Sequence, residues 1–138
     1  MAYLLDTNTV SYLIQKRPII VDKVASAGGL SNLSVAAITA AELRYGVERM
    51  PEGRRKVNNL ADLFTVLGEI EIRPFTEDAA AAFGWAAALL ESAGVAFSFP
   101  DLAIASIALV EDITVASNDG FFEHVQKVCG LKFERWEP

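Results

Sequence analysis

The chain has 138 residues, 52% of them hydrophobic, with 12 basic and 18 acidic side chains and a net charge of −6. This length predicts one domain, residues 1–138, with a sizeable core. The acidity argues against a general nucleic-acid binder, which needs an excess of Lys and Arg. The one thiol, Cys129, excludes an internal disulfide and fits a reducing, cytoplasmic location.

Neither a signal peptide nor a membrane span is expected. No basic segment precedes an apolar stretch at the N-terminus, and an acid already stands at position 6. The longest uncharged apolar run, residues 79–90, has twelve residues, whereas about twenty are needed to cross a bilayer. We interpret this run as a buried helix, and the high apolar content as a sign of an oligomer or a complex.

The first half of the chain alternates strand-like and helical patterns. A short apolar run at 3–6 predicts a strand that leads directly to Asp6, and Pro18 is expected to end the helix that follows. The predicted elements are a strand at 3–6, helices at 8–16 and 19–27, a strand at 33–38, and helices at 39–49 and 53–67.

The second half continues the alternation. Pro74 closes a strand at an edge or end of the sheet, and Thr76 is placed to cap a helix. The predicted elements are a strand at 70–74, helices at 76–92 and 102–110, a strand at 113–116, a short helix, and a last strand at about 131–135. Strands alternating with helices throughout predict a three-layer α/β/α fold with a central, mainly parallel sheet.

Four acids are predicted to meet at one edge of this sheet. Asp6 and Asp119 follow predicted strands, while Glu42 and Asp101 lie in the first turns of helices that start on the same edge. Side chains at the carboxyl ends of parallel strands converge on one crevice. Carboxylates that close together repel each other unless a cation neutralises them. Mg²⁺ takes oxygen ligands and is usually shared with substrate phosphate, so the pattern favours phosphoryl chemistry.

Each acid also has a purely local interpretation. Asp6 can cap the helix that follows it, Glu42 stands at capping-box spacing from Thr39, and Asp101 at the same spacing from Ser98. The tetrapeptide 117–120, which contains Asp119, is typical of a turn. The residues alone leave both interpretations open for each acid.

Four motifs, in this order and spacing, closely resemble the PIN-domain ribonucleases of VapC toxin type. They are Leu5-Asp6-Thr7-Asn8, Ala41-Glu42-Leu43-Arg44-Tyr45-Gly46, Asp101-Leu102-Ala103-Ile104-Ala105, and Ser117-Asn118-Asp119 with Phe122. The resemblance implies a PIN-like fold and a nuclease that cuts RNA with Mg²⁺ or Mn²⁺. It also implies a VapB-like antitoxin that holds the nuclease inactive.

The resemblance implies a role in the active site for each residue that stands at a matching position of a motif. Asp6, Glu42, Asp101 and Asp119 become the catalytic acids, with Asp6, Asp101 and Asp119 as metal ligands. The fourth position is open, because relatives place either an asparagine at Asn118 or an acid at Asp119. Thr7, Asn8 and Asn118 are expected beside the ligands, where they position metal-bound waters.

Five basic residues fall within thirteen positions and are candidates for contact with RNA or antitoxin, although a solvated helix face explains them equally well. They are Arg44, Arg49, Arg54, Arg55 and Lys56. Together with the high content of hydrophobic residues, this cluster of basic residues predicts a homodimer that binds an antitoxin peptide. His124 is expected to be an ordinary helix residue, and Trp85 a core or dimer contact rather than a base-stacking group.

Two other functions remain open at this point. A haloacid-dehalogenase-like phosphatase is suggested by Asp6-Thr7-Asn8, although Asn8 replaces that family's general acid and no later motif follows. A catalytically silent PIN-like module is the non-enzymatic alternative. A neighbouring gene for a small protein with a DNA-binding N-terminus would favour a toxin.

Overall fold

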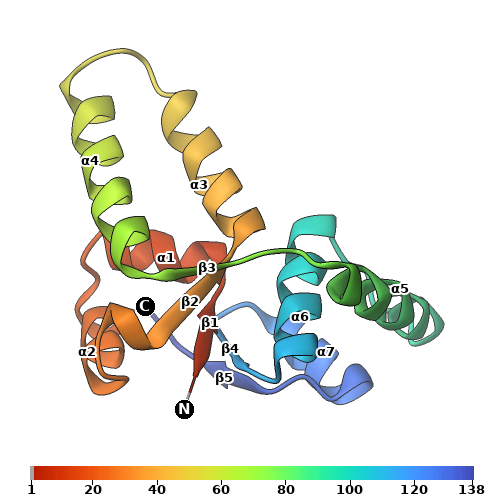
Figure 1. Ribbon diagram of the computed structural model, residues 1–138. Helices are drawn as coiled ribbons and strands as arrows, with labels where there is room; N and C mark the ends of the chain where they lie inside the picture. The colour runs from red at the N-terminus through yellow and green to blue at the C-terminus, as the bar shows by residue number, and fades with distance from the viewer. Residues whose placement is uncertain (1) are drawn as a thin grey trace.

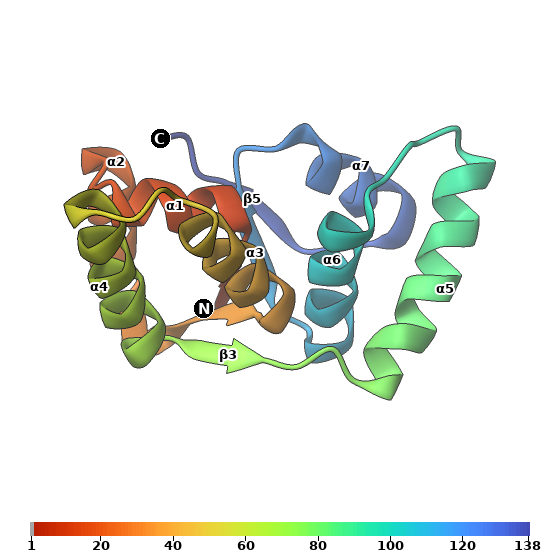
Figure 2. The same cartoon turned by 90° about the horizontal axis from the view of Figure 1, so that it is seen from above.

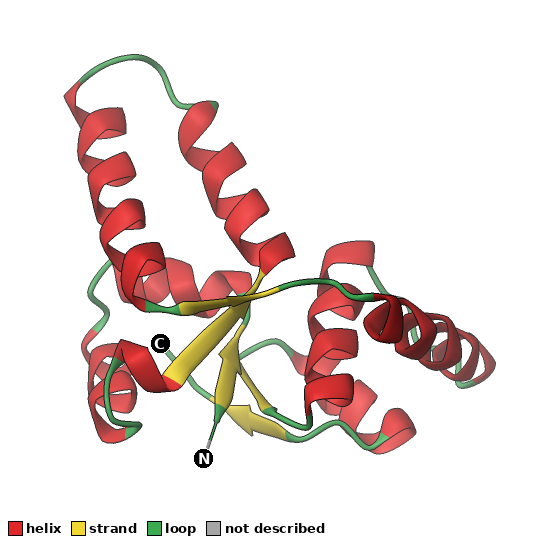
Figure 3. Ribbon diagram, viewed as in Figure 1, coloured by secondary structure: helices red, strands yellow, loops and turns green. Residues whose placement is uncertain are grey.

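The computed structural model describes residues 2–138 and contains a central sheet of parallel strands (Figure 3). The strand order is β3-β2-β1-β4-β5, with every neighbouring pair parallel. The strands are β1 (Tyr3–Leu5), β2 (Leu33–Ala36), β3 (Glu71–Arg73), β4 (Thr114–Ser117) and β5 (Phe133–Arg135). The predicted fold class, three-layer α/β/α with a parallel sheet, is confirmed.

Helices cover both faces of the sheet. They are α1 (Thr7–Ile14), α2 (Pro18–Ser26), α3 (Ala37–Glu48), α4 (Arg54–Glu69), α5 (Glu77–Ser92), α6 (Phe99–Glu111) and α7 (Gly120–Cys129), with a short 3₁₀ turn at Leu30–Asn32. Figure 1 shows α3 and α4 rising side by side as an arm above the sheet. Seen from above, α5 lies outermost on the opposite flank, beyond α6 (Figure 2).

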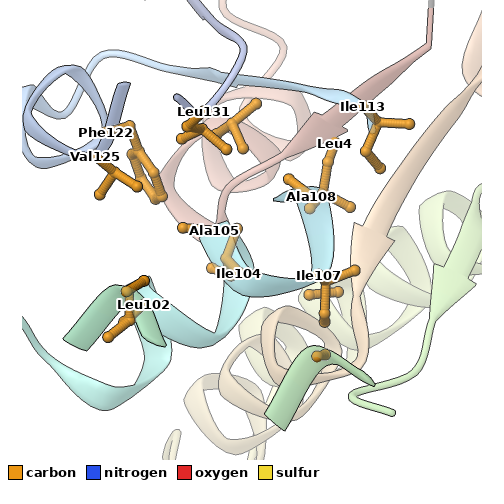
Figure 4. Packing of buried hydrophobic residues seen from close by; sticks show 14 of the residues in the cluster. Leu4, Leu102, Ile104, Ala105, Ile107, Ala108, Ile113, Phe122, Val125 and Leu131 are labelled. Atoms are coloured by element: carbon orange, nitrogen blue, oxygen red, sulfur yellow. The ribbon is translucent and has the colours of Figure 1, made fainter. Parts of the chain in front are cut away.

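Adjacent residues of β1 point into two separate cores, because side chains alternate across a strand. Leu4 packs against α5, α6 and α7 in a cluster with Ile104, Ile107 and Phe122 (Figure 4). Leu5 packs on the other face, where residues of α1 and α2 cover the sheet. Both leucines are fully buried. A strand covered on both faces explains why its sequence is apolar rather than alternating.

The connection order places a topological switch point between β1 and β4. The chain moves outward from β1 through β2 to β3, then returns to the other side of β1 for β4 and β5. In open parallel sheets, ligands bind at the carboxyl ends of the strands at such a point. Asp6 follows β1 directly and Asp119 follows β4 by two residues, so both lie at this position.

Most predicted elements are present, with shifted boundaries. The predicted strand at 33–38 ends at Ala36, because α3 begins at Ala37 rather than at Thr39. Helix α1 ends at Ile14 and the chain turns at Lys16 with a left-handed backbone (φ 58°), so Pro18 does not end that helix. Pro18 is instead the first residue of α2, where its missing N–H costs nothing.

The interpretation of residues 79–90 as a buried helix is wrong. In α5 only Ala79, Ala86 and Leu90 are buried, whereas Trp85 keeps 54% of its surface exposed. One narrow stripe of alanines lets α5 lie close to α6, and the rest of the helix faces outward. No helix within residues 2–138 is long and apolar enough to span a membrane.

Candidate active site

Asp6 caps α1 and is also buried at the switch point. Its Oδ1 accepts a hydrogen bond from the Thr9 amide at 2.9 Å, so the capping interpretation is correct. Its Oδ2 accepts one from the Ser117 hydroxyl at 2.7 Å, across to the end of β4. Burial raises the pKa of Asp6, the bonds from Thr9 and Ser117 lower it, and the charge of Asp119 raises it again. The cap alone does not explain this second set of contacts.

Ser117 joins two of the acids. Its hydroxyl donates to Asp6 and accepts from the backbone amide of Asp119 at 2.9 Å. Ser117 is fully buried, and Asp119 in turn caps α7 by accepting from the Phe121 amide. From the sequence, Ser117 was expected in a turn and in the fourth motif, with no role of its own. Its position directly before Asn118-Asp119 at a strand end was the available signal.

Glu42 is held by a side chain from another element and not by a capping box. The hydroxyl of Thr7 donates to Glu42 Oε1 at 2.7 Å and lies 3.1 Å from the Thr39 hydroxyl. The predicted Thr39 cap is absent, because α3 starts at Ala37 and Thr39 is buried inside the helix. The local explanation for Glu42 therefore fails, and Thr7 is the residue that orients it.

Burial and the charges of the three other acids affect the pKa of Asp101. Ser98 caps α6 by accepting from the Asp101 amide, as the spacing predicted. Burial raises the pKa of Asp101, the bond with Ser98 lowers it, and the negative charges of Asp119, Asp6 and Glu42 raise it further. Asp101 therefore lies within electrostatic reach of the three other predicted acids.

Helix N-termini make this concentration of acids tolerable. Asp6 and Asp119 are N-cap residues and Asp101 lies in the first turn of α6. The positive end of a helix dipole stabilises an anion placed there. The positive ends of three helices therefore lie at the acidic cluster. The negative charge of the cluster remains available to a cation.

The four acids supply only oxygen donors, which suit a hard divalent cation. Within residues 2–138, no group of three or more Asp, Glu, His or Cys side chains lies close enough together to hold a metal ion. Zn²⁺ structural sites are closed by four protein ligands. Mg²⁺ keeps several waters and needs only one or two carboxylates together with substrate phosphate. An all-oxygen, open cluster of acids matches the second case.

The basic residues occupy the arm, away from direct contact with the acids. Arg44 lies over the ring of Phe64 and Arg49 over the ring of Tyr45. Lys56 pairs with Glu52 at 2.8 Å, whereas Arg54 and Arg55 are exposed at the start of α4. In the described chain, none of the five forms an ion pair with the four acids.

Other residues singled out from the sequence lie around or outside the site. Asn8 is exposed in the first turn of α1, and the Asn118 carbonyl accepts a hydrogen bond from Arg135. His124 is exposed on α7. Trp136 is buried, 5.1 Å from Tyr3 between ring centroids, so it presents no surface for base stacking.

A groove of about 430 Å³ opens beside Glu42, between α1, α3 and α4. Thr7 and Glu42 belong to its lining, together with the polar residues Ser11, Gln15 and Asn59. Its apolar lining consists of Ile14, Leu43, Val47, Met50 and Leu63. A pocket with an apolar lining and several polar groups fits a ligand that carries both kinds of group.

Comparison with known proteins agrees with this geometry. The family model of the PIN domain matches residues 3–128. Ribonuclease VapC2 of Haemophilus influenzae is 31% identical over 137 residues, covering 99% of this chain and 98% of that protein. Ribonuclease VapC2 of Rickettsia felis is 29% identical over 138 residues, covering 99% of both.

Solved structures show the same likeness. The VapBC2 complex of Rickettsia felis, bound to a DNA fragment from its promoter, contains a chain with a TM-score of 0.85 and 28% identity, covering 99% of this chain and 100% of that one. The DNA-bound VapBC of Salmonella typhimurium matches with a TM-score of 0.85 and 27% identity, covering 99% of each chain. These matches confirm the resemblance drawn from the four motifs, and the chain belongs to the PIN-domain family.

Proposed function

We propose that this chain is a divalent-metal-dependent endoribonuclease that acts in the cytoplasm as the toxin of a toxin–antitoxin pair. One observation carries the proposal: the Ser117 hydroxyl joins Asp6 and Asp119 at the switch point of the sheet, and burial and the charges of both acids raise the pKa of Asp101. The curated relatives that match over nearly the full chain are ribonucleases of VapC type. Family membership also removes the basis of the phosphatase alternative, which was a likeness in the first motif only.

Each acid has a role in this proposal. Asp6, Asp101 and Asp119 hold Mg²⁺ or Mn²⁺, with Asn8 and Asn118 beside them. Such an ion, when bound, polarises the scissile phosphate and lowers the pKa of a bound water. Glu42 has Oε1 fixed by Thr7, so its Oε2 is the atom that we assign to orienting the attacking water. The Ser117 hydroxyl fixes the position of Asp6 relative to Asp119.

Metal removal tests the proposal. Excess EDTA should abolish cleavage of RNA, and Mg²⁺ or Mn²⁺ should restore it. The same ions should raise the thermal unfolding midpoint, since an ion that binds only the folded chain stabilises it by mass action. A preparation of the Asp6→Asn variant is the control for contaminating nucleases. Undiminished cleavage in EDTA by the wild type alone would contradict metal dependence.

The groove beside Glu42 supports an antitoxin peptide as the partner. An amphipathic segment can lay apolar side chains along a groove of this kind, here against Leu43, Val47 and Leu63. A basic side chain at its end would reach the acids and compete with metal through charge-assisted hydrogen bonds. Copurification from the native operon should yield a second small protein. A toxin that purifies alone under those conditions would count against this partner.

The exposed side of α5 supports self-association. Trp85 is 54% exposed and Leu89 36% exposed on the same helix, and large aromatic residues are enriched at interfaces. We assign this side to a homodimer. Light scattering should give twice the monomer mass at micromolar concentration, and Trp85→Glu should reduce it. Monomer at every concentration for the wild type would refute the dimer.

A further inference from the structure

Helix α3 presents two different sides above the acids. With 3.6 residues per turn, residues seven apart lie on the same side. Tyr45 therefore shares a side with Ile38, which packs against the core cluster that contains α6 residues. Glu42 lies next to this side, and Asp101 is in the first turn of α6. Tyr45 thus projects one turn above Glu42 on the α6 side of the arm.

The groove lies on the other side of α3. Its α3 lining consists of Glu42, Leu43, Gly46 and Val47, and Tyr45 is not part of it. Tyr45 is 66% exposed although the Arg49 guanidinium lies 5.6 Å from its ring centroid. A large aromatic ring with a cation beside it is therefore mostly open to solvent, one helical turn from Glu42.

We propose that Tyr45 and Arg49 form a stacking platform for an unpaired base of single-stranded RNA next to the bond that is cut. This inference rests on the proposed ribonuclease function and adds the residues that recognise the substrate. Every base has a flat face, so stacking on an aromatic ring binds single strands with little sequence preference. Arg49 beside the ring supplies positive charge for the adjacent phosphate.

The charge of the arm as a whole favours RNA over a protein, and Arg49 is the basic residue that lies beside the Tyr45 ring. Residues 44–56 carry five basic and two acidic side chains, in a chain whose net charge is −6. That local excess of positive charge complements a phosphate backbone. The groove, which suits a peptide, is lined by other residues of α3, and neither Tyr45 nor Arg49 belongs to its lining.

The arm contains its own control. Phe64 on α4 is 52% exposed and has the Arg44 guanidinium 4.7 Å from its ring centroid. Two residues turn a helix by about 200°, so Arg44 leaves α3 nearly opposite Glu42. Phe64 and Arg44 therefore reproduce the exposed ring and cation of the platform on a side that faces away from the acids.

The experiment measures binding of a labelled single-stranded RNA of mixed sequence by fluorescence anisotropy, in an Asp6→Asn background that prevents cleavage. Loss of one stacked base weakens binding by about five- to 150-fold, so Tyr45→Ala should show a loss within this range. Tyr45→Phe and Tyr45→Trp should restore it, and Phe64→Ala should match the parent. A duplex of the same sequence should show no difference between Tyr45→Ala and the parent, since its bases are already stacked.

The possible results separate this inference from the proposed function. If wild type cleaves RNA but Tyr45→Ala and Phe64→Ala bind the single strand equally well, the platform is refuted while the nuclease stands. If Tyr45→Ala binds RNA normally but no longer holds the copurified antitoxin, the surface is a protein-docking face and the inference is wrong. Wild type that cleaves no RNA under any metal condition refutes the proposed function itself. Thermal unfolding of each variant must match the parent.

Discussion

Comparison of Asp6→Asn with Asp6→Ala separates the two roles that Asp6 combines. In the wild type, Oδ1 accepts from the Thr9 amide and Oδ2 from the Ser117 hydroxyl. The asparagine carbonyl can keep the first bond. Its NH₂ group then faces the Ser117 oxygen, which has a second lone pair besides the one that accepts from Asp119. One hydrogen bond is reversed, and the Ser117 O–H group loses its acceptor.

The structure sets different stability losses for the two variants. Asp6 is 3% exposed, and removing its charge also removes a desolvation cost that raises its pKa. In Asp6→Asn the removal of that desolvation cost offsets the Ser117 O–H group left without an acceptor, so we expect the free energy of unfolding to fall by about 1 kcal/mol or less. Asp6→Ala loses the cap, about 1 kcal/mol, and leaves the Ser117 hydroxyl unpaired, about 1–3 kcal/mol. Its total loss should be about 2–4 kcal/mol.

Urea unfolding and RNA cleavage together provide the assay. Both variants should lose cleavage by orders of magnitude, and neither should inhibit growth when expressed, because each lacks a ligand charge. Asp6→Ala should show the lower urea midpoint. A stable and fully active Asp6→Asn protein would refute the reasoning. Combined with a fully active Glu42→Gln protein, that result would favour the catalytically silent interaction module.

Three further predictions follow from the same contacts. Burial raises the pKa of Asp6 and Asp101 above the ordinary 3.8, so the metal-free protein should become more stable as pH falls from neutral through those raised values toward 3.8, while its metal affinity falls. Urea midpoints that do not rise anywhere between neutral pH and 3.8 would contradict this. Ser117→Ala should lower the free energy of unfolding by about 1–3 kcal/mol, as measured in urea, and reduce cleavage, whereas Ser117→Thr should keep both nearer the wild type. Thr7→Val removes the hydroxyl that holds Glu42 and should lower kcat with little change in thermal midpoint; unchanged kcat would show that Glu42 needs no such anchor.

The sequence by itself determined what depends on near neighbours. The apolar run before Asp6 forms β1, and the capping roles of Asp6, Thr76 and Ser98 are as predicted. Each of these three caps is a hydrogen bond within three residues, so its donor and acceptor can be identified directly from the sequence. The alternation of strands and helices likewise restricts the sheet to a parallel one.

Only the tertiary structure decided which distant side chains meet. Ser117 reaches Asp6 across 111 residues, and Thr7 reaches Glu42 across 35. Both contacts depend on strand order, since β4 and β2 flank β1, and no local pattern encodes that order. The alanine-rich α5 was misjudged for a related reason. A short apolar run shows that a helix can be buried. The neighbouring elements decide which side of the helix is buried, and α6 covers only one side of α5.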